Sequence, residues 1–180
     1  GTVLAIKRFY FRKTLLAVIN SLMGLPPVLV GLIVYLYLSR SGPLGWLGIL
    51  YSPTAMIIAQ VILIAPIITA LSNQIIEELH EDYRDLFLSL NAKPMQAVFA
   101  YIYDSRYSLL TVILAGFGRA ISEVGAVIIV GGNIDHLTRV MTTAIALETS
   151  KGNLTLALGL GIILLIISLC ISLLVMWIKS

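Results

Sequence analysis

The sequence predicts an all-α protein, a polytopic bundle of at least four transmembrane helices. Of its 180 residues, 59% are hydrophobic and 12% are charged, whereas soluble domains average about 45–50% and about 25%. A single core of this size cannot bury so much apolar surface, so lipid must cover part of it. Four apolar stretches also exceed the roughly 20 residues that a helix needs to cross a bilayer.

The four expected spans cover residues 14–38, 53–76, 107–132 and 154–178. The first, second and fourth contain no charged residue. None shows the alternation of polar and apolar residues over about ten positions that marks a strand of a membrane barrel. No internal repeat or low-complexity linker separates the spans. We therefore expect one transmembrane domain over residues 1–180, with a polar loop at 77–106 between the second and third spans.

Basic residues are distributed unevenly between the two sides of this bundle. One side has Lys7, Arg8, Arg12, Lys13, Arg84, Lys93, Arg106 and Lys179. The other side has Arg40, Arg139 and Lys151. Because cytoplasmic loops carry the excess of lysine and arginine, the first side is predicted to be cytoplasmic. Residues 39–52 and 133–153 then face outward, and the chain is expected in the cell membrane as a multi-pass protein.

Several classes of function are disfavoured by the composition and motifs. The net charge is only +3 and the basic residues form no stripe, so no nucleic-acid partner is expected. His80-Glu81 begins like a zinc-protease motif, but Arg84 stands where its second histidine would be. No phosphate-binding loop and no nucleophile–base pair is recognisable. We expect no enzyme activity, no metal site and no cofactor in this chain.

The 77–106 loop contains an amphipathic segment. Tyr83, Leu86, Phe87 and Leu90 recur at i, i+3, i+4 and i+7, which places them on one helical face. Asn91 is a plausible helix C-cap. The pattern predicts a short exposed helix between two spans. Two interpretations remain open, a helix lying on the membrane surface or a knob that inserts into a soluble partner.

Irregular residues occur near the middle of three spans. Pro26 and Pro27 lie in the first, Pro66 in the second and Arg119 in the third. An arginine at the bilayer centre is costly and should face the bundle or a cavity, and prolines at matching depth suggest a midplane site or gate. Glu123 follows Arg119 by four residues, so the two can pair. Arginine before glutamate is the weaker order for such a pair, so both a structural pair and a pathway role remain open, and the prolines could equally be packing kinks.

The segment Asp85-Leu86-Phe87-Leu88-Ser89-Leu90-Asn91-Ala92 resembles the EAA loop of ABC importer permeases, E-A-A-x-x-L-G-A. Asp85 stands for its glutamate, Leu86 and Phe87 for its alanines and Asn91 for its glycine. The family's later I-x-L-P falls at residues 101–104, where this chain reads Tyr-Ile-Tyr-Asp.

Further segments resemble the molybdate/tungstate branch of these permeases. They are 116–126, which reads GFGRAISEVGA, the Gly-Gly-Asn of 131–133, and 25–31 together with 42–45. Residues 138–149, TRVMTTAIALET, resemble the tungstate importers most. The resemblance covers nearly the whole chain. Family members have one more span before Lys7, so this chain is expected to lack an N-terminal span.

The resemblance implies a permease subunit of an ABC importer that moves an oxyanion, tungstate or molybdate, into the cytoplasm. It implies a homodimer, two cytoplasmic ATPase subunits that hold ATP and Mg, and an extracytoplasmic oxyanion-binding protein. The ATPase contact would fall on Asp85, Leu86, Phe87, Ser89, Leu90, Asn91 and Ala92. The translocation pathway or gate would involve Pro26, Pro27, Pro66, Arg119 and Glu123. The choice among tungstate, molybdate and sulfate stays open, and the alternative function is an ion-coupled secondary transporter.

Overall fold

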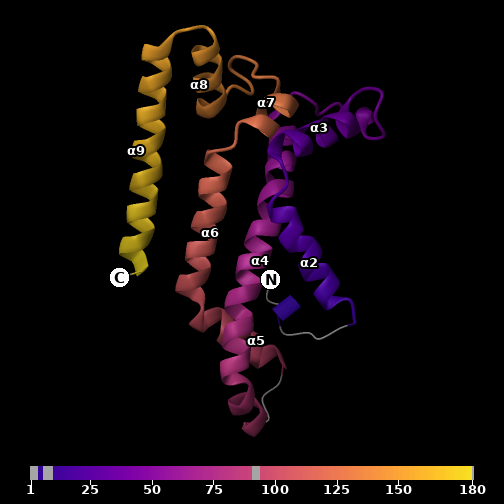
Figure 1. Ribbon diagram of the computed structural model, residues 1–180, viewed down its shortest axis with the longest axis vertical. Helices are drawn as coiled ribbons and strands as arrows, with labels where there is room; N and C mark the ends of the chain where they lie inside the picture. The colour runs from indigo at the N-terminus through magenta and orange to yellow at the C-terminus, as the bar shows by residue number, and fades with distance from the viewer. Residues whose placement is uncertain (1–3, 6–9, 91–93, 180) are drawn as a thin grey trace. The chain divides into compact units, whose positions relative to one another are not determined.

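The computed structural model describes residues 4–5, 10–90 and 94–179. Within them the secondary structure is helical and contains no strand, which confirms the predicted all-α fold (Figure 1). The helices are α2 (Arg12–Met23), α3 (Pro27–Leu38), the 3-10 helix η1 (Gly45–Leu47), α4 (Pro53–Ser89), α5 (Pro94–Asp104), α6 (Arg106–Ile121), α7 (Gly125–Gly131), α8 (Met141–Ser150) and α9 (Leu154–Lys179). Of the basic residues predicted to be cytoplasmic, Lys7, Arg8 and Lys93 lie outside the described residues.

Among the described residues, two helices are long and apolar enough to cross a membrane, α4 with 37 residues and α9 with 26. The first expected span corresponds to the broken pair α2 and α3, and the third to α6 and α7, which are bent by 57°. If each broken pair counts as one span, up to four spans are present among the described residues. The count of four and the cytoplasmic or outward placement of the loops stay predictions.

The chain divides into two compact units. One consists of residues 1–24 and 65–117, and the other of residues 25–64 and 118–180. The boundary passes through α4 and α6, which contribute to both. The expectation of a single domain over 1–180 is not tested by this division.

The core of the second unit joins α3, α4 and α7. Its buried residues are Val30, Val34, Leu38, Ala55, Met56, Ala59, Leu63, Ala126, Val127 and Val130. Small residues bring α3 and α7 into close contact: a Cβ added at Gly31 would lie 2.7 Å from the Cα of Ala126. Glycine at a helix contact allows two backbones to approach, as in other membrane bundles.

Pro26 and Pro27 begin a helix, which corrects the prediction that they lie in the interior of one. α2 ends at Met23, Pro26 is extended with φ −63° and ψ 123°, and Pro27 is the first residue of α3. A residue before proline is biased towards extended backbone, and proline suits the first helical position because it has no N–H to leave unpaired. Pro66, by contrast, lies inside α4.

The first unit is built around the contact of α4 with α5. Ile76 on α4 packs with Ala5, Ala97 and Tyr101, and Leu79, Tyr83 and Phe87 cover this cluster. The segment predicted as a separate short helix is instead the C-terminal part of α4, which continues without a break to Ser89. The reason is that the 77–90 sequence contains neither glycine nor proline, so nothing stops the helix that the apolar span begins.

Candidate functional site

Arg119 and Glu123 form an ion pair at the end of α6. Nη1 of Arg119 lies 3.3 Å from Oε2 of Glu123. The two side chains differ in burial, since 35% of the arginine and 4% of the glutamate is exposed. The pair therefore consists of a carboxylate held inside the second unit and a cation that reaches its surface.

Glu123 lies in the break between α6 and α7 and is held on three sides. Its Oε1 accepts a hydrogen bond from the backbone N–H of Ala126 at 3.0 Å, in the first turn of α7. Its backbone carbonyl accepts a hydrogen bond from the Thr142 hydroxyl at 3.2 Å, at the start of α8. A carboxylate near a helix N-terminus is favourable because the first N–H groups have no partner within the helix. One residue thus connects α6, α7 and α8.

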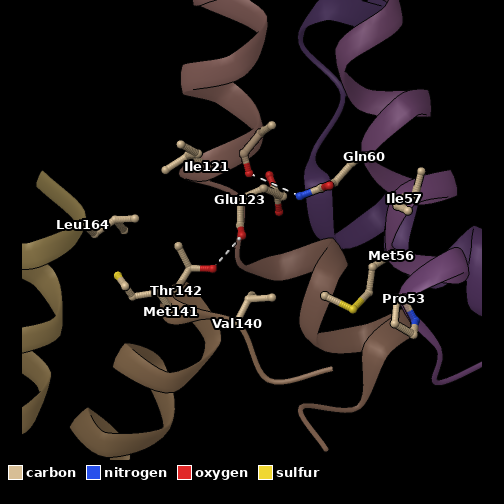
Figure 2. Close-up of a pocket in the computed structure, with 11 residues that line it drawn as sticks. Pro53, Met56, Ile57, Gln60, Ile121, Glu123, Val140, Met141, Thr142 and Leu164 are labelled. Carbon is tan, nitrogen blue, oxygen red and sulfur yellow. Dashed lines mark hydrogen bonds between the residues drawn. The ribbon is translucent and has the colours of Figure 1, made fainter. Parts of the chain in front are cut away.

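A cavity of about 370 Å³ opens beside Glu123 (Figure 2). Its wall comes from α4, the end of α6, the start of α8 and α9, and consists of Pro53, Met56, Ile57, Gln60, Ala120, Ile121, Glu123, Val140, Met141, Thr142 and Leu164. Figure 2 shows Gln60 and Thr142 reaching from opposite sides towards the turn that contains Glu123. Gln60 donates a hydrogen bond to the carbonyl of Ala120 at 3.3 Å. The lining is mostly apolar, and its polar groups gather at this turn.

The cation of the pair keeps unused hydrogen-bonding capacity. A guanidinium has five N–H donors and no acceptor. Among the described residues, Glu123 is the one polar partner recorded for the Arg119 side chain. The remaining N–H donors of the partly exposed arginine can reach water or an anion. The buried Glu123 carboxylate, by contrast, already contacts Arg119 and the Ala126 N–H. This arrangement could hold a negatively charged solute at Arg119.

The structure brings some of the predicted pathway residues together. The start of α3 lies against the start of α7. A Cβ added at Gly125 of α7 would lie 2.9 Å from Cγ2 of Val28 in α3, and it would lie 3.6 Å from Oε1 of Glu123. Pro27 directly precedes Val28, so the start of α3 lies near the Glu123 carboxylate. Pro66 belongs to the first unit, and its predicted depth beside Arg119 stays a prediction.

Sequence reasoning missed Gln60 and Thr142. Gln60 is the one amide side chain in the apolar stretch 53–70, and that was the available signal. Thr142 gave no signal, because its hydrogen bond joins residues 19 positions apart. Within the described residues, no group of three or more histidine, cysteine, aspartate or glutamate side chains could hold a metal ion.

The predicted partner-docking segment lies at the end of α4. Asp85, Leu86, Ser89 and Leu90 are exposed there. Phe87 is half-buried, and its ring meets that of Tyr101 edge-on at a centroid distance of 5.4 Å. The face predicted to hold Tyr83, Leu86, Phe87 and Leu90 is therefore split, with the two aromatic rings turned to α5 and the two leucines outward. Asn91 and Ala92 lie outside the described residues.

Tyr101 holds α4 and α5 together. It is 1% exposed, its hydroxyl lies 2.9 Å from Nδ1 of His80, and its ring stacks on Tyr83. Burial raises the pKa of the Tyr101 hydroxyl above its usual value, since a phenolate would lose its hydration there. The hydroxyl stays protonated and can donate to the histidine. The end of α4 is thus supported on one side and open on the other.

The whole chain, residues 1–180, matches the family described as binding-protein-dependent transport system inner membrane component. It is 43% identical over 162 residues to a probable anion ABC transporter permease protein of Haloferax volcanii, covering 87% of this chain and 70% of that protein. It is 41% identical over 172 residues to the tungstate uptake system permease protein TupB of Peptoclostridium acidaminophilum, covering 96% and 75%. Identity to the protein of the same name in Campylobacter jejuni is 37% over 164 residues, covering 91% and 69%.

Proposed function

We infer that this chain, which belongs to the family of binding-protein-dependent transport system inner membrane components, is the permease subunit of an ATP-driven importer of a tungstate-class oxyanion. The membership confirms the resemblance of the chain to ABC importer permeases. It also makes the chain an integral membrane component of a transport system that includes a binding protein. The relatives named for tungstate and for an anion support the oxyanion. Nothing in the comparisons favours an ion-coupled secondary transporter.

Arg119 is the structural feature that favours an anion as the transported solute. Its guanidinium is partly exposed while the carboxylate that pairs with it is buried and hydrogen-bonded elsewhere. A dianion such as tungstate loses hydration on entering a membrane protein, and a preplaced cation offsets part of that cost. In this proposal Arg119 exchanges water for the oxyanion during passage, and Glu123 holds the arginine in place between transport events.

The energy for transport would come from partner subunits. We expect two copies of this chain, two cytoplasmic ATPases that hold ATP and Mg, and an extracytoplasmic oxyanion-binding protein. The end of α4, with exposed Asp85, Leu86, Ser89 and Leu90, is the proposed ATPase contact, to which the undescribed Asn91 and Ala92 would add. Because α4 continues unbroken from this contact into the apolar span, movement of the docked ATPase would be passed directly to a membrane-spanning helix.

Uptake into proteoliposomes tests the proposal. The permease is reconstituted with its ATPase and binding protein, and radiolabelled tungstate is added outside with ATP inside the vesicles. We expect uptake that requires both ATP and the binding protein, that persists with a protonophore, and that unlabelled molybdate and sulfate inhibit less than unlabelled tungstate. Uptake driven by an ion gradient without ATP would contradict the assignment. Stronger inhibition by unlabelled sulfate than by unlabelled tungstate would overturn the choice of tungstate but not the assignment as an ATP-driven importer.

A further inference from the structure

We propose that the outward face of α5 is a membrane-surface anchor that lies against the lipid headgroups of the cytoplasmic leaflet. Met95, Phe99, Ile102 and Tyr103 are all exposed. They recur at i, i+4, i+7 and i+8, which places them on a single face of the helix. The exposed fraction reaches 65% for Phe99 and 66% for Tyr103. This face is distinct from the one that packs on α4 through Ala97 and Tyr101.

α5 is apolar on two opposite faces, and α4 covers one of them. Between Pro94 and Asp104 the helix has one charged residue, Asp104, at its last position. A helix that is apolar all round is ordinarily buried all round. The open face therefore needs a cover that the first unit, within its described residues, does not supply.

Arg106 and two tyrosines indicate that the cover is lipid. The Arg106 guanidinium lies 4.2 Å from the ring centroid of Tyr103 and 4.6 Å from that of Tyr107. It also donates a hydrogen bond to the Tyr103 carbonyl at 2.8 Å, and it makes no ion pair within the described residues. Tyrosine and arginine combine an apolar body with a polar tip, so both concentrate at the membrane–water boundary. This cation is free to attract anionic phospholipid.

The position of α5 in the chain supports the same occupant. Ser105 alone separates α5 from α6, whose apolar sequence is part of the expected third span. The Tyr103–Arg106–Tyr107 contacts tie the exposed face of α5 to the first turn of α6. That face is therefore continuous with the surface of the expected third span. The exposed Leu86 and Leu90 lie at the end of a different helix, α4, and belong to the proposed ATPase contact.

Spin labels on single cysteines test the inference. Phe99→Cys and Met95→Cys are made in a Cys170→Ser background, with Ser89→Cys, at an exposed site of the proposed ATPase contact, as the matched control on α4. Each protein is labelled in liposomes with and without the ATPase. We expect the labels at 95 and 99 to collide more with lipid-soluble oxygen than with a water-soluble nickel chelate. The label at 89 should show the reverse preference. Adding the ATPase should shield 89 and leave 95 and 99 unchanged.

Three results would overturn the inference. Preferential collision with nickel at both 95 and 99 would place the face in water. Exclusion of both reagents without the ATPase would indicate another protein surface, such as a second copy. Shielding of 95 and 99 by the ATPase would make α5 part of that docking surface.

The role of Arg106 is tested in vesicles of phosphatidylcholine with or without phosphatidylglycerol. Added phosphatidylglycerol should raise the oxygen preference at 99, and Arg106→Gln should lose this response. The same response in Arg106→Gln would remove the anionic-lipid part of the inference. Because none of these measurements uses transport, a failure here is separate from a failure of the proposed function.

Discussion

Glu123 is 4% exposed while Arg119, whose Nη1 lies 3.3 Å from its Oε2, is 35% exposed. The two members of the pair therefore differ in their access to solvent. The glutamate side chain also accepts a hydrogen bond from the Ala126 N–H, and its backbone carbonyl accepts one from the Thr142 hydroxyl. Glu123 therefore helps to hold α6, α7 and α8 together. The arginine has no such second attachment among the described residues. Structural and transport roles can therefore belong to different members of one ion pair.

Close packing of α3 on α7 predicts that Gly31→Ala destabilises the protein. The new Cβ would lie 2.7 Å from the Cα and 3.2 Å from the carbonyl oxygen of Ala126, both backbone atoms that cannot move alone. Overpacking of this kind costs about 1–3 kcal/mol, and a lower thermal midpoint in detergent would report it. Gly118→Ala is the matched control, because its added Cβ has no atom within 4 Å other than those of its chain neighbours and its own helix backbone.

The control should be neutral or stabilising by up to about 1 kcal/mol, the usual difference between alanine and glycine inside a helix. A lower midpoint for Gly118→Ala than for Gly31→Ala would mean that another chain packs on α6 at this point. An unchanged midpoint for Gly31→Ala would show that α3 and α7 are not in close contact.

The split face at the end of α4 predicts two different phenotypes. Leu86→Asp, at an exposed site, should leave the thermal midpoint unchanged and abolish copurification of the ATPase. Phe87→Ala removes a ring that packs on Tyr101 and should destabilise the protein by about 2 kcal/mol, roughly half the cost at a fully buried phenylalanine. Stoichiometric copurification with the Leu86→Asp protein would show that the ATPase docks elsewhere.

Local pattern predicted the elements of this fold better than their ends. The apolar lengths of 53–76 and 154–178 indicated α4 and α9, because a long apolar stretch has few stable alternatives to a helix. The spacing of Arg119 and Glu123 allowed their pair. Pro27 was misplaced inside a helix, since the sequence alone does not show whether a proline bends one helix or starts the next.

The division of the α4 face was not predictable either. Tyr83 and Leu86 share a face by periodicity, but the ring of Tyr83 stacks on Tyr101, eighteen positions along the chain. Gln60 and Thr142 converge on Glu123 from α4 and α8. Contacts between distant segments depend on the packing of whole helices, and neither spacing nor composition records them.

Topology can be checked with cysteines at sites that the structure shows to be exposed. In a Cys170→Ser background, cysteines at Ser41 and His136 should react with an impermeant maleimide in intact cells. His136 is chosen because its side chain is 96% exposed, whereas the neighbouring Asn133 is partly buried. A cysteine at Ser89 should react only after the cells are permeabilised. Labelling at Ser89 in intact cells, with none at Ser41, would invert the orientation.

The last prediction is that Arg119 serves transport in addition to its pairing with Glu123. Arg119→Gln removes the cation and leaves the Glu123 carboxylate buried without its charged partner. Breaking a buried pair on one side costs about 3–5 kcal/mol, so this single variant should be unstable whichever role the arginine has. Glu123→Gln removes the stranded charge, and its amide oxygen can still accept the Ala126 N–H. The double variant Arg119→Gln, Glu123→Gln should therefore recover much of the thermal midpoint.

Transport then separates the two roles. If Arg119 meets the passing oxyanion, the stable double variant should remain slow in ATP-dependent tungstate uptake, because no cation is left at the end of α6. Glu123→Gln alone keeps that cation and should transport faster than the double variant at a comparable midpoint. Proteoliposome uptake is measured beside the thermal midpoint of each protein, so that loss of fold is not mistaken for loss of the site. Full uptake by the stable double variant would leave Arg119 as a structural partner of Glu123, since the anion would then cross without it.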